Sequence, residues 1–263
     1  MGFTIAVAGK GGTGKTTLCG LMIRYLLAQG RSPVLAIDAD ANANLHEVLG
    51  LERGESVGCL REKSMEEIKD LPMGITKEQY IEQRIHEILV EGSGVDLLTM
   101  GRPEGPGCYC YANHLIRKYS ERISKSYQYV IMDNEAGLEH LSRRTTQNVD
   151  VLVICTDESL RGLRTVQRIV DIIKELQLKI ERICLVVNRS MNGLTDAFHD
   201  QIQGMNIQLV GVIPSDEVLV QYDREGRPLI ELPETSAAMQ MISEITPQLI
   251  EKSEKEGCNA CHR

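Results

Sequence analysis

The sequence predicts an α/β fold, in which a mostly parallel β-sheet is flanked by helices. Short apolar runs alternate along the 263 residues with amphipathic stretches, as they do in right-handed βαβ units. The chain has only two Phe and no Trp, so Ile, Leu, Val and Met must fill the core, which suits a sheet buried on both faces. No repeat, low-complexity block or Pro/Gly/Ser linker interrupts the pattern, so residues 1–263 are expected to form a single domain.

Seven apolar runs are the predicted strands. Each is short, rich in Val, Ile or Leu, and followed by a loop. They are Phe3–Ala8, Val34–Asp38, Val95–Thr99, Tyr129–Asp133, Val151–Thr156, Ile183–Asn188 and Gln208–Ile213.

The intervening segments carry helical periodicity, with apolar residues three and four positions apart. The predicted helices are Lys15–Gln29, Lys77–Val90, Ala112–Ser124, Leu160–Leu176, Asp196–Gln203 and Ser236 to about Lys255. Pro247 is expected to kink or interrupt the last of them. Leu51–Ile75 is the least regular region, expected to form short helices and loops, and 254–263 is expected to be a mobile tail.

Charge and hydropathy exclude several classes of function. The net charge of −8 argues against a nucleic-acid partner, because phosphate binding needs a basic face. No stretch approaches the roughly 18 to 20 apolar residues of a membrane span. Met1 runs straight into the first strand and leaves no room for a signal peptide. A cytoplasmic location is therefore expected, where the eight cysteines stay reduced and serve packing, metal binding or redox chemistry.

A glycine-rich loop joins the first strand to the first helix. It reads Gly9-Lys10-Gly11-Gly12-Thr13-Gly14-Lys15-Thr16-Thr17. This string meets the pattern G-x-x-x-x-G-K-[ST] in the strand–loop–helix context of a true P-loop. Its backbone N–H groups and the helix N-terminus form a nest for phosphates. Lys15 is expected to reach the β- and γ-phosphates of a nucleotide, and the Thr16 hydroxyl to bind Mg²⁺.

A second lysine, Lys10, stands at the start of this loop. The string G-K-G-G-T-G-K-T-T resembles the deviant Walker A motif of MinD, ParA, the arsenite-pump ATPase and the nitrogenase iron protein. In that class the early lysine reaches across a dimer interface to the partner's nucleotide, and nucleotide binding closes the dimer. The resemblance implies a homodimeric ATPase in which Lys10 supplies positive charge to the reacting phosphates.

Three aspartates follow strands near this loop. By the same resemblance, Asp38 helps to organise Mg²⁺, and Asp40 orients or deprotonates the attacking water. Asp133 corresponds to the Walker B carboxylate behind a magnesium-bound water. Aspartate also favours helix caps and turns, so capping is the alternative for all three.

The base of the nucleotide is expected beyond the carboxyl ends of later strands, where ligands of open α/β sheets bind. Asn188 ends one predicted strand, and in related ATPases an Asn at this place reads the adenine edge. The turn that begins with Pro214 would line the other side. The guanine signature Asn-Lys-x-Asp is missing, so ATP is favoured over GTP.

Cys108 and Cys110 flank Tyr109 in a loop rich in glycine and proline. Side chains two positions apart diverge, so one pair seldom closes a four-thiolate site. Two pairs, one from each half of a dimer, can supply four thiolates to one thiophilic ion. The alternative is that these are unremarkable loop cysteines.

The remaining cysteines divide into two groups. Cys155 and Cys184 lie in apolar strands and are expected in the core, whereas Cys19 on a helix and Cys59 in an irregular loop are expected to be structural or incidental. The tail spells the haem-attachment pattern C-x-x-C-H with Cys258, Cys261 and His262, but covalent haem attachment needs export. The tail is therefore expected to capture or pass on a soft metal, or to be incidental.

One string after the fourth strand identifies a narrower family. It reads Asp133-Asn134-Glu135-Ala136-Gly137-Leu138-Glu139-His140-Leu141. Together with the P-loop and the C-x-C pair, it resembles the CooC/AcsF family of nickel-insertion ATPases, which mature carbon monoxide dehydrogenase and acetyl-CoA synthase. Thr13 stands where that family usually has Val.

Membership of this family would imply a homodimer whose two C-x-C pairs bind one Ni²⁺, or Zn²⁺ in its place. ATP would close the dimer around Lys10 and change the metal site, and the apo forms of the two enzymes would be the clients. Glu135 and His140 would belong to a second switch, or Glu139 and His140 would only begin a helix.

Two other functions compete with this one. An iron–sulfur reductase like the nitrogenase iron protein would also use four thiolates, but it has a ligand Cys after the Walker B region, and Asp133–Arg144 contains none. A MinD- or ParA-type positioning ATPase would need a membrane-targeting tail or a basic face for DNA. Glu251–Glu256 is mixed in charge and the chain is acidic, so neither device is evident.

Overall fold

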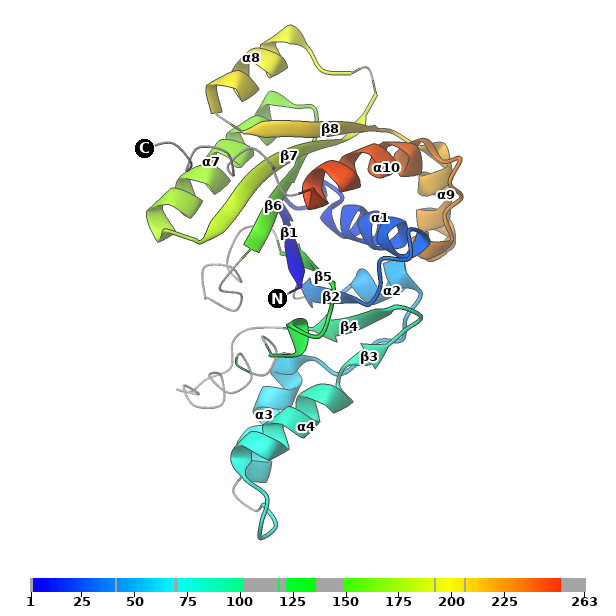
Figure 1. Cartoon of the computed structure of the whole chain (residues 1–263). Helices are drawn as coiled ribbons and strands as arrows, with labels where there is room; N and C mark the ends of the chain where they lie inside the picture. The colour runs from blue at the N-terminus through cyan, green and yellow to red at the C-terminus, as the bar shows by residue number, and fades with distance from the viewer. Residues whose placement is uncertain are drawn as a thin grey trace, which may run out of the picture.

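The structure is a computed structural model of the chain. It describes residues 2–40, 42–68, 71–101, 118, 122–135, 149–191, 193–205 and 207–251. Figure 1 shows a central twisted sheet with helices packed on both of its faces.

Eight strands form this sheet in the order β3-β4-β2-β5-β1-β6-β7-β8. Their bounds are β1 Phe3–Gly9, β2 Val34–Ala39, β3 Val90–Glu91, β4 Val95–Thr99, β5 Tyr129–Asn134, β6 Val149–Thr156, β7 Ile180–Ser190 and β8 Gln208–Pro214. Every pair is parallel except β3 with β4. The predicted parallel α/β fold is therefore confirmed, and all seven predicted strands are present. The two-residue edge strand β3 was not predicted.

The described helices are α1 Lys15–Ala28, α2 Leu45–Leu49, α3 Val57–Glu67, α4 Lys77–Glu87, α7 Leu160–Leu176, α8 Asp196–Met205, α9 Glu217–Glu225, the 3₁₀ turn η2 Leu229–Glu231 and α10 Ala237–Ile250. Helix α7 has the predicted bounds. Most of the predicted helix Ala112–Ser124 lies outside the described residues.

Two expectations about helices need correction. The region 51–75 contains an 11-residue helix, α3, where only short helices and loops were expected. Its buried side contains Arg61 and Ser64 as well as Val57 and Leu60, so the helix shows little apolar periodicity. The last helix runs through Pro247 and ends at Ile250, short of Lys255. The Arg182 guanidinium donates hydrogen bonds to the carbonyls of Gln248 and Leu249, which stabilises this end of α10.

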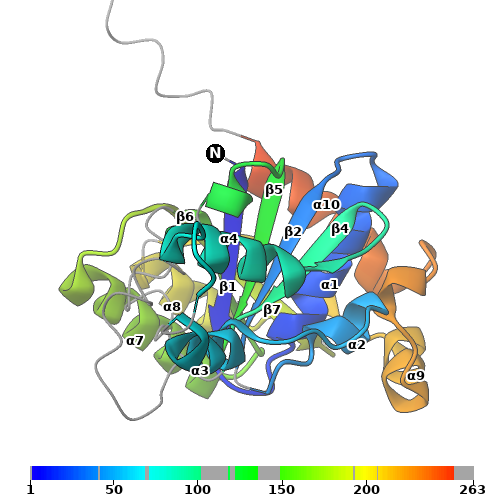
Figure 2. The same cartoon turned by 90° about the horizontal axis from the view of Figure 1, so that it is seen from below.

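Alternate residues of the strands face two separate apolar cores. In β1, Ile5 and Val7 pack toward α1 and α10, whereas Ala6 and Ala8 pack toward α7 and α8. Figures 1 and 2 show α1 and α10 on one side of the sheet and α7 on the other. This double cover makes the central strands fully buried. Their polar residues are therefore concentrated at the carboxyl edge of the sheet.

Candidate functional site

The glycine-rich loop lies at the carboxyl end of β1 and leads into α1. Gly9 and Gly14 have positive φ angles of 152° and 87°. A Cβ atom on Gly9 would lie 2.2 Å from the Cys155 carbonyl oxygen, and one on Gly14 would lie 2.3 Å from Asn188 Nδ2. Both positions therefore require glycine, because a side chain would meet backbone strain and a close neighbour.

The two lysines of the loop differ in exposure. Lys15 is 7% exposed, and its Nζ lies 3.5 Å from the Lys10 carbonyl oxygen. The Thr13 hydroxyl donates to the same oxygen at 2.9 Å, so this carbonyl closes the loop. Lys10, Gly11 and Gly12 are exposed. Lys15 is thus buried within its own glycine-rich loop, while Lys10 stands on the surface.

Two carboxylates meet beside the loop. Neighbouring strands β2 and β5 pair Asp38 with Asp133 in register. The Thr16 hydroxyl donates to Asp133 Oδ2 at 2.5 Å, and Asp133 is 1% exposed. Burial raises the pKa of Asp133 to about 7; the Thr16 hydrogen bond opposes this shift and the nearby Asp38 adds to it. Asp133 Oδ1 is buried with no hydrogen-bond partner among the described residues.

Asp38 organises the segment that follows β2. Its Oδ1 accepts a hydrogen bond from the Asp40 N–H at 3.1 Å, and its Oδ2 accepts one from the Leu45 N–H at 2.9 Å. Burial raises the pKa of Asp38, and these two N–H groups oppose the shift. Asp40 in turn accepts from the Asn42 N–H at 2.8 Å. In this structure both aspartates therefore act as turn and helix-start residues, and their roles toward Mg²⁺ and water stay predictions.

The donors gathered here fit Mg²⁺. The Thr16 hydroxyl and the carboxylates of Asp38 and Asp133 are hard oxygen ligands, which this ion prefers. The buried, unpartnered Oδ1 of Asp133 is an acceptor that a cation or its bound water would satisfy. When bound, Mg²⁺ would neutralise charge on the β- and γ-phosphates.

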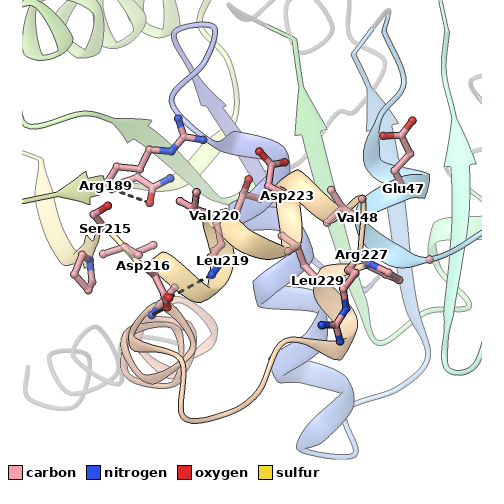
Figure 3. Close-up of a pocket in the computed structure, with 18 residues that line it drawn as sticks. Glu47, Val48, Arg189, Ser215, Asp216, Leu219, Val220, Asp223, Arg227 and Leu229 are labelled. Carbon is pink, nitrogen blue, oxygen red and sulfur yellow. Dashed lines mark hydrogen bonds between the residues drawn. The ribbon is translucent and has the colours of Figure 1, made fainter.

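A cavity of about 450 Å³ opens beside the phosphate loop, beyond the ends of β7 and β8. Thr17, Asn188 and Pro214 line it. Residues of α2 and α9 line it as well, among them Val48 and Leu219 (Figure 3). Its volume lies in the range of small-molecule sites. Two residues predicted to surround the base, Asn188 and Pro214, thus border one cavity. Their contact with a base stays a prediction.

The Asn188 side-chain amide makes hydrogen bonds that hold the glycine-rich loop in place. Its Nδ2 donates to the Thr13 carbonyl at 2.9 Å, and its Oδ1 accepts from the Arg189 N–H at 3.0 Å. The Cys155 thiol donates to the same Thr13 carbonyl at 3.3 Å. Cys155 and Asn188 therefore anchor the loop from β6 and β7, a role that was not predicted for either residue.

Asp216 belongs to the turn that begins with Pro214, which was predicted to line the base site, and it borders the same cavity. Its capping of two helices was not predicted. Its Oδ1 accepts from the N–H groups of Val218 and Leu219, which caps α9. Its Oδ2 accepts from the Ser236 hydroxyl and the Ala238 N–H at the start of α10. One carboxylate thus begins two helices. The signal in the sequence is Asp directly before a helix, the usual N-cap pattern.

The predicted metal ligands Cys108, Cys110, Cys258, Cys261 and His262 lie outside the described residues, as do Glu139 and His140.

The cysteines that the structure describes are unpaired. Cys155 and Cys184 are buried in the core as predicted, and Cys19 is buried as well. Cys59 lies on α3, which corrects its expected place in an irregular loop. In the described part of the chain, no group of three His, Cys, Asp or Glu side chains is arranged to hold a metal. No helix in that part is long and apolar enough to cross a membrane.

Residues 4–229 match the CobQ/CobB/MinD/ParA nucleotide binding domain. The chain is 43% identical to an uncharacterized ATP-binding protein of Methanocaldococcus jannaschii over 94% of its length and 98% of the relative's. It is 32% identical to the carbon monoxide dehydrogenase accessory protein CooC of Rhodospirillum rubrum, over 84% of this chain and 87% of that one.

Among solved structures, the fold resembles the MinD protein of the Aquifex aeolicus MinC:MinD complex. The TM-score is 0.71 at 24% identity, covering 95% of this chain and 96% of that one. A ParA family ATPase of Chlorobium tepidum has a TM-score of 0.72 at 19% identity, covering 94% and 99%. With the phosphate loop and the paired carboxylates in place, the chain belongs to the CobQ/CobB/MinD/ParA family of nucleotide-binding P-loop ATPases.

Proposed function

We propose that this ATPase is a metallochaperone that inserts nickel into carbon monoxide dehydrogenase or acetyl-CoA synthase. The observation that carries the proposal is the 32% identity to CooC, a carbon monoxide dehydrogenase accessory protein, over 84% of the chain. The Cys108–Cys110 pair adds the soft ligands that a nickel carrier needs. The proposed place of action is the cytoplasm, where both thiols stay reduced.

The exposure of the two lysines supports a dimeric machine. Lys15 is buried within its own phosphate site, so it is placed to act on the nucleotide of its own protomer. Lys10 is exposed on the same loop and is free to meet a second copy. In such a dimer the two Cys108–Cys110 pairs would supply four thiolates to one Ni²⁺ or Zn²⁺. Cys258, Cys261 and His262 would be an accessory site for the cargo.

A short chain of backbone contacts supports coupling between the two sites. The Met100 N–H donates to the Asp38 carbonyl at 2.8 Å, and the Met100 carbonyl accepts from the Gly58 N–H at 2.9 Å. Gly101 follows with a φ of 68° and packs against Ser56. The segment with Cys108 begins immediately afterwards. A change at Asp38 on binding of nucleotide would therefore act on the chain that leads to the cysteines, and the coupling would be reciprocal.

A nickel titration followed by analytical ultracentrifugation, with and without ATP, tests this function. We expect one Ni²⁺ per dimer, lost in the double variant Cys108→Ala/Cys110→Ala and kept in the control Cys59→Ala. Stoichiometric nickel binding that survives the double change would refute the shared site. A brown protein with broad Fe–S absorption would favour a reductase. ATP-dependent pelleting with liposomes or DNA would favour a positioning ATPase.

A further inference from the structure

Arg189 has a backbone conformation that non-glycine residues rarely adopt. Its φ is 58°, at the end of β7 where the register with β8 shifts between Val187 and Ser190. The neighbouring residue fixes this bulge: the Ser190 hydroxyl donates to Glu158 at 2.7 Å, and the Ser190 carbonyl accepts from the Ser215 N–H at 2.9 Å. The left-handed conformation is therefore built into the framework that surrounds it.

The bulge directs the Arg189 side chain toward the phosphate loop. Its Nη1 donates to the Gly12 carbonyl at 3.3 Å, at the exposed part of the loop. Arg189 also lines the cavity next to Asn188 and Pro214. Figure 3 shows the side chain extending from the end of β7 to the loop. The guanidinium thus lies between the phosphate loop and the cavity.

Among the residues that the structure describes, Gly12 is the one hydrogen-bond partner of the guanidinium, so most of its donors are unused there. Arginine carries five N–H donors, and the one that contacts Gly12 does so at the long end of the hydrogen-bond range. In the described part of the chain, no carboxylate lies within ion-pair distance of Arg189. A neutral carbonyl is a weaker partner for a cation than a phosphate oxygen is.

We propose that Arg189 is a nucleotide-binding residue whose guanidinium donates to the phosphate chain of the bound nucleotide, in exchange for the Gly12 carbonyl. The phosphate loop surrounds the phosphates from β1 and α1, and Arg189 adds a cation from the far side, at the end of β7. This inference depends only on nucleotide binding and is independent of nickel and of any client enzyme.

The test compares Arg189→Gly with Arg182→Ala. Glycine suits the positive φ, so Arg189→Gly removes the guanidinium without straining the backbone. Arg182 lies on the same strand and also donates to backbone carbonyls, at the far end from the loop. Isothermal titration of each variant with ATP and with the magnesium salt of inorganic tripolyphosphate measures the two affinities. A cooperative thermal unfolding transition that begins above the temperature of the titration verifies that each variant is folded.

We expect Arg189→Gly to weaken the binding of ATP and of tripolyphosphate by similar factors, each roughly tenfold or more, as for a lost charged hydrogen bond. Arg182→Ala should leave both unchanged, and Arg189→Lys should restore part of the loss. ATP affinity within twofold of the parent in Arg189→Gly would overturn the proposal. A loss for ATP without a loss for tripolyphosphate would also overturn it, because the contact would then be with the base or ribose.

Discussion

The Thr16 hydroxyl and Asp133 Oδ2 lie 2.5 Å apart, in a hydrogen bond that joins the start of α1 to the end of β5. Asp133 is deeply buried, and its second oxygen has no partner among the described residues. The protein therefore maintains a poorly solvated acceptor beside its phosphate loop. This arrangement destabilises the nucleotide-free protein and favours binding of a cation, as is common at functional sites.

The raised pKa of Asp133 predicts how stability depends on pH without nucleotide. A carboxyl with a pKa near 7 when folded and near 4 when unfolded binds its proton more tightly in the folded state. The contribution of Asp133 to the free energy of unfolding is most favourable below pH 4. It declines as pH rises to about 7, by up to roughly 1.4 kcal/mol per pH unit. Asp133→Asn keeps the acceptor for Thr16 and should remove this decline.

Urea unfolding of the parent and Asp133→Asn between pH 4.5 and 7.5 measures the effect. The two free energies of unfolding should converge at low pH, and the variant should be the more stable at high pH. Parallel pH profiles for the two proteins would contradict the prediction. ATP hydrolysis by the variant, measured at neutral pH with Mg²⁺, should fall at least tenfold, because the amide carries no charge for the cation.

Two glycines of the loop provide a matched pair of substitutions. Gly14→Ala adds a methyl group 2.3 Å from Asn188 Nδ2 at a φ of 87°, whereas Gly12→Ala meets nothing within 4 Å at a φ of 80°. Both variants share the backbone strain of about 1 to 2 kcal/mol. We expect Gly14→Ala to weaken the affinity for ATP by roughly a hundredfold and Gly12→Ala to weaken it far less. Equal losses in titrations with ATP would mean that the contact with Asn188 is unimportant.

Asp216 should contribute strongly to stability, because it begins both α9 and α10. Burial raises its pKa, but hydrogen bonds from Ala238, Ser236, Leu219 and Val218 outweigh this effect, so that the net shift is downward. The contribution is present above the ordinary pKa of about 4 and is lost as pH falls through the lower folded value.

Asp216→Ala should therefore lower the free energy of unfolding by about 2 to 4 kcal/mol at neutral pH, measured by urea denaturation. Asp223→Ala is the control, since Asp223 lines the same cavity from an exposed position on α9. Similar small effects of the two changes would show that the double cap is energetically unimportant.

A mixing experiment separates the roles of the two lysines. If Lys15 acts on its own protomer's nucleotide and Lys10 on the partner's, Lys10→Ala and Lys15→Ala should each abolish ATP hydrolysis alone. A mixed dimer would contain one site with both lysines intact. Combining the inactive variants in equal amounts should therefore restore up to about a quarter of the parent rate, the statistical yield with half the dimers mixed and one working site in each. A mixture as inactive as its parts would place both lysines in one protomer.

Much of the fold was predictable because strand residues repeat simple patterns. The apolar runs predicted the sheet, and the amphipathic face of 160–176 predicted α7. The loop motif predicted the phosphate site. Helix α3 could not be found in this way, because charged side chains outnumber its apolar ones. Short helices such as α2 depend on a distant cap, here the Asp38 carboxylate on Leu45, and have little periodicity of their own.

The residues that form the candidate site were largely predictable, but the contacts between them were less so. Thr16 and Asp133 were placed in one site by their motifs, and the structure brings them together. The anchoring of the loop by Asn188 and Cys155 depends on three strands that meet only in the folded sheet. Arg189 carries no signal in the sequence, since its conformation is set by a bulge between β7 and β8.

The proposed function requires that the binding of nucleotide and the binding of metal be coupled. It is tested most directly by measuring the Kd for Ni²⁺ with and without a non-hydrolysable ATP analogue, and the Kd for the analogue with and without Ni²⁺. We expect each ligand to change the affinity of the other by the same factor, typically between about 5- and 150-fold, and Cys108→Ala/Cys110→Ala to abolish the effect. Two affinities for Ni²⁺ that agree with and without the analogue would contradict it.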